Sequence, residues 1–149
     1  MPNTMKNKIG LLIEAICFMF VYLFVYAAST KLLEYDLFKA QIGKSPLITK
    51  YVDLISWMVP TVEILVAVML IFHRTRLFAL YSSFSLMFAF TAYIILILNF
   101  SPYVPCSCGG ILNGMGWTEH LIFNAVFTLL SVVGIFLHIQ KKQQQVVTI

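Results

Sequence analysis

The chain has 149 residues, of which 60% are hydrophobic, 15% aromatic and only 11% charged, and its formal net charge is +4 at pH 7. Soluble domains are about a quarter charged and about half apolar, so this composition excludes an ordinary soluble protein and indicates one embedded in a lipid bilayer. The positive charge lies beside the apolar blocks, where it carries topology information, and nothing in it suggests a nucleic-acid partner.

Four apolar blocks of about twenty residues follow one another along the chain. They cover residues 9–29, 52–72, 77–99 and 118–139. As a helix, each block is long enough to cross about 30 Å of hydrocarbon. Helices are expected because a membrane-spanning segment must satisfy its own backbone hydrogen bonds. The sequence therefore predicts an all-α fold, an integral membrane four-helix transmembrane bundle that residues 1–149 form as a single transmembrane domain.

The first block has a second interpretation, as a secretory signal peptide. Lys6 and Lys8 precede it, and the small-residue stretch at 25–27 resembles a cleavage site. The apolar core of a signal peptide normally has about 7–15 residues, whereas this block is longer and contains Glu14, which suits a helix packed against others. We therefore expect it to remain as the first transmembrane helix.

The segment that follows the first block spaces Leu32, Tyr35, Phe38 and Ile42 at helical intervals, with charged residues between them. This pattern predicts a short amphipathic segment in the first outer loop, lying at the membrane interface. Two roles are open for it. It either caps the outer end of the bundle or acts as a lid over the cysteine segment described below.

The second block contains Glu63 about ten residues from either end, near the middle of the membrane. Inserting an acidic side chain there costs on the order of 2.5–3.5 kcal/mol, so Glu63 needs a partner. Proton handling and structural pairing are both open for it. Tyr93 and Asn124 are expected at similar depths in the third and fourth blocks. With His120 they form either a polar column or hydrogen bonds that merely hold the helices together.

Three cysteines are present. Cys17 lies within the first block and is expected to be a packing residue. The stretch VPCSCGG places Cys106 and Cys108 one residue apart between the third and fourth blocks. A disulfide that closes so short a loop gains only about 1.6 kcal/mol of chain entropy. Because strained or exposed disulfides are the readily reduced ones, this pair suits a redox switch better than a structural staple.

A metal site and a structural corner are the alternatives for this pair. Cys106, Cys108, Met115 and His120 offer soft ligands to Cu(I) or Zn(II), but a Cys-x-Cys pair with one distant histidine is a match of low specificity. No metal is therefore predicted. His120 suits proton movement during thiol exchange or a hydrogen bond to a quinone carbonyl, and a simple interfacial histidine is the plainer interpretation. A quinone is thus a possible cofactor, and the sequence identifies none.

Basic residues predict the orientation of the bundle. Six of them fall on one side of it, at Lys6, Lys8, Arg74, Arg76, Lys141 and Lys142. On the other side, residues 100–117 contain no lysine or arginine, although the first outer loop has four lysines. The positive-inside rule places both termini in the cytoplasm. The cysteine segment then faces an oxidising, extracytoplasmic compartment.

The run VPCSCGGILNGMGWTEHLIFN, with the upstream stretches STKLLEYDLFKAQIGKSPL, VPTVEILVAVMLI and FTAYIILIL, resembles the methylamine-utilisation MauE group of DoxX-like membrane proteins. The residues that carry the resemblance are Cys106, Cys108, Gly109, Gly110, Trp117, His120 and Asn124, with looser matches at Lys31 and Glu63. The resemblance implies a redox-associated four-helix bundle of the bacterial inner membrane. The namesake of the group assists the maturation of a disulfide-rich periplasmic enzyme subunit alongside a thioredoxin-like partner.

Residues and resemblance together predict thiol–disulfide exchange through Cys106 and Cys108 with a thioredoxin-like protein or a periplasmic substrate protein. Whether the chain is an enzyme, a thiol–disulfide oxidoreductase, stays open. The alternative is an accessory or scaffold subunit whose cysteine segment binds a partner without electron flow. A metal-binding role is a further alternative, as is transport, which rests on Glu63 alone and would require an oligomer.

Overall fold

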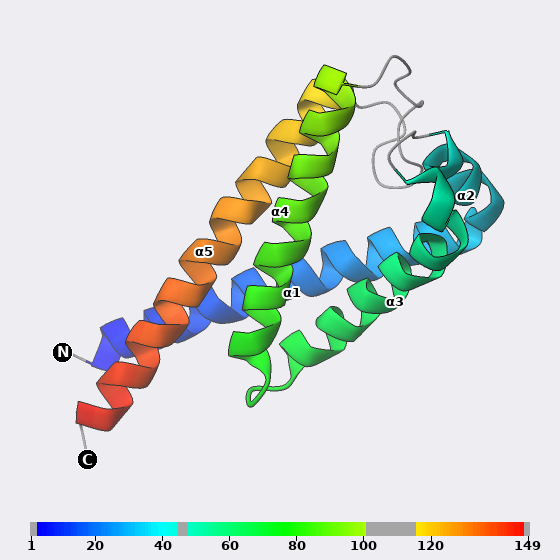
Figure 1. The fold of residues 1–149 in the computed structure, drawn as a ribbon. Helices are drawn as coiled ribbons and strands as arrows, with labels where there is room; N and C mark the ends of the chain where they lie inside the picture. Colours follow the sequence, from blue (N-terminus) through cyan, green and yellow to red (C-terminus); the bar gives the residue numbers. More distant parts are fainter. Residues whose placement is uncertain (1–2, 45–47, 101–115, 148–149) are drawn as a thin grey trace.

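The computed structural model describes residues 3–44, 48–100 and 116–147. All regular structure in these ranges is helical (Figure 1), and the elements are α1 (Asn3–Leu33), α2 (Tyr35–Gly43), the 3-10 helix η1 (Thr49–Tyr51), α3 (Val52–Ile71), α4 (Arg76–Phe100) and α5 (Trp117–Val147). Four of them, α1, α3 together with η1, α4 and α5, are long and apolar enough to cross a membrane. The prediction of a multi-pass, all-helical membrane protein is therefore confirmed.

Two helices extend well beyond the apolar blocks that predicted them. Helix α1 begins at Asn3 and α5 continues to Val147, whereas the blocks began near residue 9 and ended near residue 139. The added turns contain lysine and glutamine, which are good helix formers. An apolar block marks only the part of a helix that lies in hydrocarbon, so it underestimates the length of a helix with polar ends.

The long helices pack as two antiparallel pairs, α1 with α3 and α4 with α5, and the pairs cross each other (Figure 1). Buried apolar side chains at the crossing, such as Phe20, Leu70 and Leu80, form the core. A Cβ atom on Gly134 of α5 would lie 3.2 Å from Ile16 of α1 and 3.2 Å from Leu80 of α4. The absence of a side chain at this position therefore lets α5 approach both neighbours closely.

Helix α2 is almost a continuation of α1. The backbone N–H of Phe38 donates to the carbonyl of Glu34 at 2.9 Å, so the hydrogen-bonding pattern resumes directly after the bend. Helix α2 packs on α3 and buries Phe38 and Ile42. An exposed ion pair between Lys39 and Asp53 also joins the two helices, and its hydrogen bond raises the pKa of Lys39. The placement of α2 at an outer membrane interface stays a prediction.

The turn between α3 and α4 lies at the end of the bundle opposite to α2, and side chains of the turn itself hold it in place. The Thr75 hydroxyl donates to the carbonyl of Met69 at 2.7 Å, and Arg76 Nε donates to the carbonyl of Leu70 at 3.2 Å. The Arg76 guanidinium also donates to both carboxylate oxygens of Glu14, at 2.7 and 3.3 Å. This ion pair ties α4 to α1 at the end where both chain termini lie (Figure 1).

Candidate functional site

A cavity of about 310 Å³ lies between the helix pairs, at the end of the bundle that α2 covers. Every helix from α1 to α5 contributes to its walls, and most of the lining is apolar. Aromatic rings are prominent in it, at Phe24, Phe38, Phe90, Tyr93, Trp117 and Phe123. A volume of this size falls at the lower end of the range of small-molecule pockets, about 300–1,000 Å³.

Six residues singled out from the sequence line this one cavity, namely Lys31, Glu63, Tyr93, Trp117, His120 and Asn124. They come from all four long helices, which are far apart along the chain. Estimates of depth along each helix predicted similar depths for Tyr93 and Asn124, and the sequence grouped them with Glu63 and His120 as either a polar column or hydrogen bonds between helices. The structure places these four residues around a shared space.

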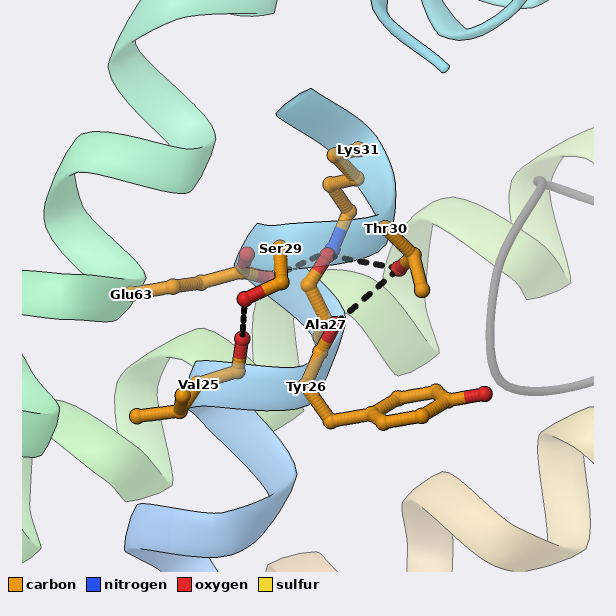
Figure 2. A network of polar contacts seen from close by, with 7 residues as sticks. All are labelled: Val25, Tyr26, Ala27, Ser29, Thr30, Lys31 and Glu63. Atoms are coloured by element: carbon orange, nitrogen blue, oxygen red, sulfur yellow. Dashed lines mark hydrogen bonds and ion pairs between the residues drawn. The ribbon is translucent and has the colours of Figure 1, made fainter. Parts of the chain in front are cut away.

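The partner that Glu63 requires is Lys31. Lys31 Nζ donates to Glu63 Oε1 at 2.6 Å, and the two side chains are 14% and 1% exposed. In Figure 2 the carboxylate extends from α3 to the last turns of α1, where the lysine side chain turns back to meet it. The ammonium also lies 5.6 Å from the ring centroid of Phe90 and 5.9 Å from that of Phe38, within the range of cation–π attraction.

Hydroxyl groups beside this ion pair are committed to the helix backbone. The Thr30 hydroxyl, on the cavity wall, lies 3.1 Å from the carbonyl of Tyr26 and 3.0 Å from that of Ala27, and the Ser29 hydroxyl donates to the carbonyl of Val25 at 2.7 Å (Figure 2). Their protons are therefore used within α1. The polar character of the cavity comes instead from the ionic and amide groups.

Two buried polar atoms of the cavity lining have no hydrogen-bond partner among the described residues. They are Glu63 Oε2 and Asn124 Nδ2. Both residues are nearly inaccessible, with 1% and 3% of their surface exposed. An unpaired buried donor or acceptor costs about 1–3 kcal/mol of stability. The cavity therefore presents one free acceptor and one free donor to whatever occupies it.

The cysteine pair and the glycines after it, Cys106, Cys108, Gly109 and Gly110, fall in the segment 101–115, outside the described residues. That segment joins the end of α4 to the start of α5, and both helices line the cavity near these ends, through Tyr93 and Trp117. The first turn of α5 is fixed by a hydrogen bond from the Gly116 N–H to Glu119 Oε2 at 3.0 Å. Chain connectivity thus attaches the cysteine segment at the cavity end of the bundle.

The remaining cysteine lies within the described ranges, whereas Cys106, Cys108 and Met115 of the metal alternative lie outside them. Cys17 is a free thiol, 3% exposed, in the apolar core, as expected for a packing residue. In residues 3–44, 48–100 and 116–147, no group of three or more histidine, cysteine, aspartate or glutamate side chains could hold a metal ion.

Sequence reasoning missed how these residues are paired. It selected both Lys31 and Glu63 but did not pair them, because the sequence of neither segment determines how α1 and α3 are aligned along each other. It also missed Phe90 and Gln41, which line the cavity. A usable signal was present, since a deeply buried acid requires a cation and Lys31 is the first basic residue after the first apolar block.

A sequence model of one protein family, described as methylamine utilisation protein MauE, matches residues 9–137 of the chain. The match extends from α1 into α5 and includes all six cavity residues named above. Neither a curated protein nor a solved structure matches the chain.

Proposed function

We propose, from the premise that the chain belongs to the MauE family, that it exchanges electrons between Cys106 and Cys108 and the thiols of a partner protein. Family membership links this multi-pass membrane protein to methylamine utilisation. The exchange reaction, its compartment and its partner are our proposal. The partner class is a thioredoxin-like protein or a secreted protein that acquires disulfides outside the cytoplasm.

The observation that carries the proposal is the cavity, with its few polar side chains, at the end of the bundle where the cysteine segment is attached. Thiol exchange requires a thiolate, and nearby lysine or protonated histidine stabilises that form. Lys31 and His120 both line the cavity. The positive charge of Lys31 is balanced by Glu63, so the group that the cavity offers to a reactive cysteine pair at this end of the protein is the imidazole of His120, a proton acceptor.

The exchange conserves atoms and electrons. A partner thiolate attacks one sulfur of the Cys106–Cys108 disulfide and forms a mixed disulfide, and the second thiol of the partner then attacks that bond. The partner leaves with a disulfide, and the pair keeps two thiols, having gained two electrons and two protons. The imidazole of His120 holds or moves a proton during these steps.

The orientation follows the positive-inside argument. Both termini lie in the cytoplasm, and the cavity end lies outside the bacterial inner membrane. That compartment is oxidising, which allows the pair to cycle between disulfide and dithiol.

A trapping experiment tests the proposal. Removal of one cysteine of an exchanging pair leaves a mixed disulfide that cannot be resolved. Cys106→Ser and Cys108→Ser are therefore expected to accumulate a higher-mass species that disappears with reductant on a gel. More trapping is expected in Cys106→Ser, because Cys108 precedes two glycines, whereas Pro105 stiffens the chain beside Cys106.

Cys17→Ser is the matched control, since it removes a buried thiol from the core and is expected to trap nothing beyond the unaltered chain. The absence of a trapped species in both pair variants would contradict electron exchange. With unchanged metal content, that result would indicate an accessory subunit that binds a partner without reacting. Loss of bound metal from either variant, again without trapping, would instead indicate a metal site.

A further inference from the structure

The buried and unpartnered groups of the cavity point to a ligand. Glu63 Oε2 accepts no hydrogen bond and Asn124 Nδ2 donates none within the described residues, although both residues are more than nine-tenths buried. Buried polar groups in proteins are almost always paired with protein or ordered water. An occupant that carries a donor for Glu63 and an acceptor for Asn124 would complete both.

The charge and the walls of the cavity restrict the chemistry of this occupant. The ionic groups Lys31 and Glu63 are paired with each other, so the pair has no net charge to offer a charged ligand. The remaining lining is mostly apolar, and a charged ligand would lose its hydration there without replacement. Phe90, Tyr93 and Trp117 offer ring faces and edges against which a flat ring packs favourably. The occupant is therefore neutral, flat and largely apolar.

The route into the cavity also restricts the source of the ligand. Ala89 lies in the middle of α4, lines the cavity and is exposed. The protein therefore leaves the cavity open at this position, and the middle of a membrane-spanning helix lies at the depth of the hydrocarbon. The cavity thus reaches the lipid-facing surface, and a molecule dissolved in the bilayer can enter without passing through water.

We propose that this cavity binds the ring of a membrane-soluble quinone or quinol. Asn124 Nδ2 donates to a ring carbonyl or hydroxyl oxygen, and Glu63 Oε2 accepts from a quinol hydroxyl. The isoprenoid tail leaves past Ala89 into the bilayer. The oxidised ring offers acceptors only and the reduced ring offers both donors and acceptors, so the reduced ring satisfies both free groups and binds more tightly.

Binding does not depend on the cysteines, but its chemical consequence rests on the proposed function. Oxidation of the Cys106 and Cys108 dithiol to the disulfide releases two electrons and two protons. A quinone in the cavity takes up both and becomes the quinol. The pair is thereby reoxidised after each exchange with a partner protein.

The two tryptophans of the chain allow a direct binding test. Trp117 lines the cavity, whereas Trp57 is 61% exposed on α3 and does not. Trp57→Phe leaves Trp117 as the only tryptophan. In the purified full-length chain in detergent, a benzoquinone with a decyl tail is expected to quench Trp117 fluorescence saturably. The matched variant Trp117→Phe is expected to show only the linear, non-saturating quenching of a quinone dissolved in the micelle.

Substitution of the donor then tests the site. In the Trp57→Phe background, Asn124→Leu is expected to raise the quinone concentration for half-maximal quenching about tenfold, the usual effect of losing one buried hydrogen bond. Asn99→Leu makes the same change at an exposed amide that donates to the carbonyl of Ile95, and it is expected to leave binding unchanged. Equal affinity in the Asn124→Leu variant and its parent would overturn the assignment.

A ligand-side control keeps the proposal falsifiable even if Asn124→Leu fails to fold. Decylbenzene has the same tail and a ring without oxygens, so it is expected not to displace the quinone at equal concentration. Equal displacement would mean that the cavity does not recognise the ring oxygens, and the absence of saturable quenching in the Trp57→Phe chain would mean that it holds only water or lipid; either result would overturn the proposal. The double variant Cys106→Ser with Cys108→Ser is expected to bind quinone normally. Quinone binding is therefore tested independently of the trapping experiment, and failure to trap a partner would not contradict it.

Discussion

The ion pairs Arg76–Glu14 and Lys31–Glu63 each join two long helices, and they differ in how completely their atoms are satisfied. At the end near the termini, Arg76 is 5% exposed, donates to both oxygens of Glu14 and also donates to the carbonyl of Leu70. At the cavity end, Lys31 meets only one oxygen of Glu63, and the other is buried without a partner in the described residues. The first pair is a completed structural bond, and the second is incomplete, as expected for a group that awaits a ligand.

The largest expected difference between the two ends is in thiol labelling. A membrane-impermeant thiol reagent applied to intact, reduced cells should label Cys106 and Cys108, whose segment is attached at the cavity end, and should not label Cys17 in the core. Mass spectrometry of the isolated chain measures this. Labelling of the pair only after the membrane has been opened would place the cavity end in the cytoplasm.

The next largest effect is expected from breaking the Lys31–Glu63 pair. Glu63→Leu leaves a nearly buried ammonium without its counter-ion, which typically costs about 3–5 kcal/mol of unfolding free energy. The double variant Lys31→Met with Glu63→Leu removes both charges and should recover most of that loss. Denaturant unfolding in detergent measures both. Equal destabilisation in the single and double variants would mean that the two side chains do not act as a pair.

A smaller effect is expected at the opposite end. Arg76→Met removes the bonds to Glu14 and Leu70 but leaves a carboxylate that is 50% exposed and can be hydrated. We expect a loss of about 2 kcal/mol, below that of Glu63→Leu, because no buried charge is abandoned. The same unfolding assay checks the order. A larger loss for Arg76→Met would reverse the comparison of the two ends.

The smallest effect is expected at the exposed pair between α2 and α3. Asp53 raises the pKa of Lys39, so the stabilisation from this pair is complete below the ordinary lysine pKa and disappears as pH rises through the raised value. Both side chains are open to solvent, and such pairs contribute little. Lys39→Ala should therefore unfold at the same denaturant concentration as the unaltered chain at neutral pH. A clear shift would show that α2 depends on this contact.

Much of the architecture could be predicted because the hydrocarbon thickness fixes the length of an apolar block. The four spans follow from this, and so does the expectation that Tyr93 and Asn124 lie at similar depths, and both line the cavity. Depth is only one of the coordinates that decide which side chains meet. The rotation of each helix and the register between helices depend on packing, and so the pairing of Lys31 with Glu63 could not be predicted.

The contribution of α2 to the site also depends on packing. The spacing of Phe38 and Ile42 indicates an amphipathic helix, but it does not say which surface their apolar face covers. In the structure they bury against the bundle and complete the cavity wall beside Lys31. The cysteine pair, the strongest chemical signal in the sequence, lies outside the described residues, and its redox role stays a prediction.

The crossing at Gly134 has a mechanical consequence for the cavity. Ten residues of α5 separate Gly134 from Asn124, a lever arm of about 15 Å at 1.5 Å per residue. If the helix pairs rotated by about 5° about the contact at Gly134, the cavity wall at Asn124, about 15 Å away, would move by about 1.3 Å. Because a methyl group at position 134 would press on Ile16 and Leu80, Gly134→Ala is expected to shift α5 at the crossing and with it the cavity wall at Asn124.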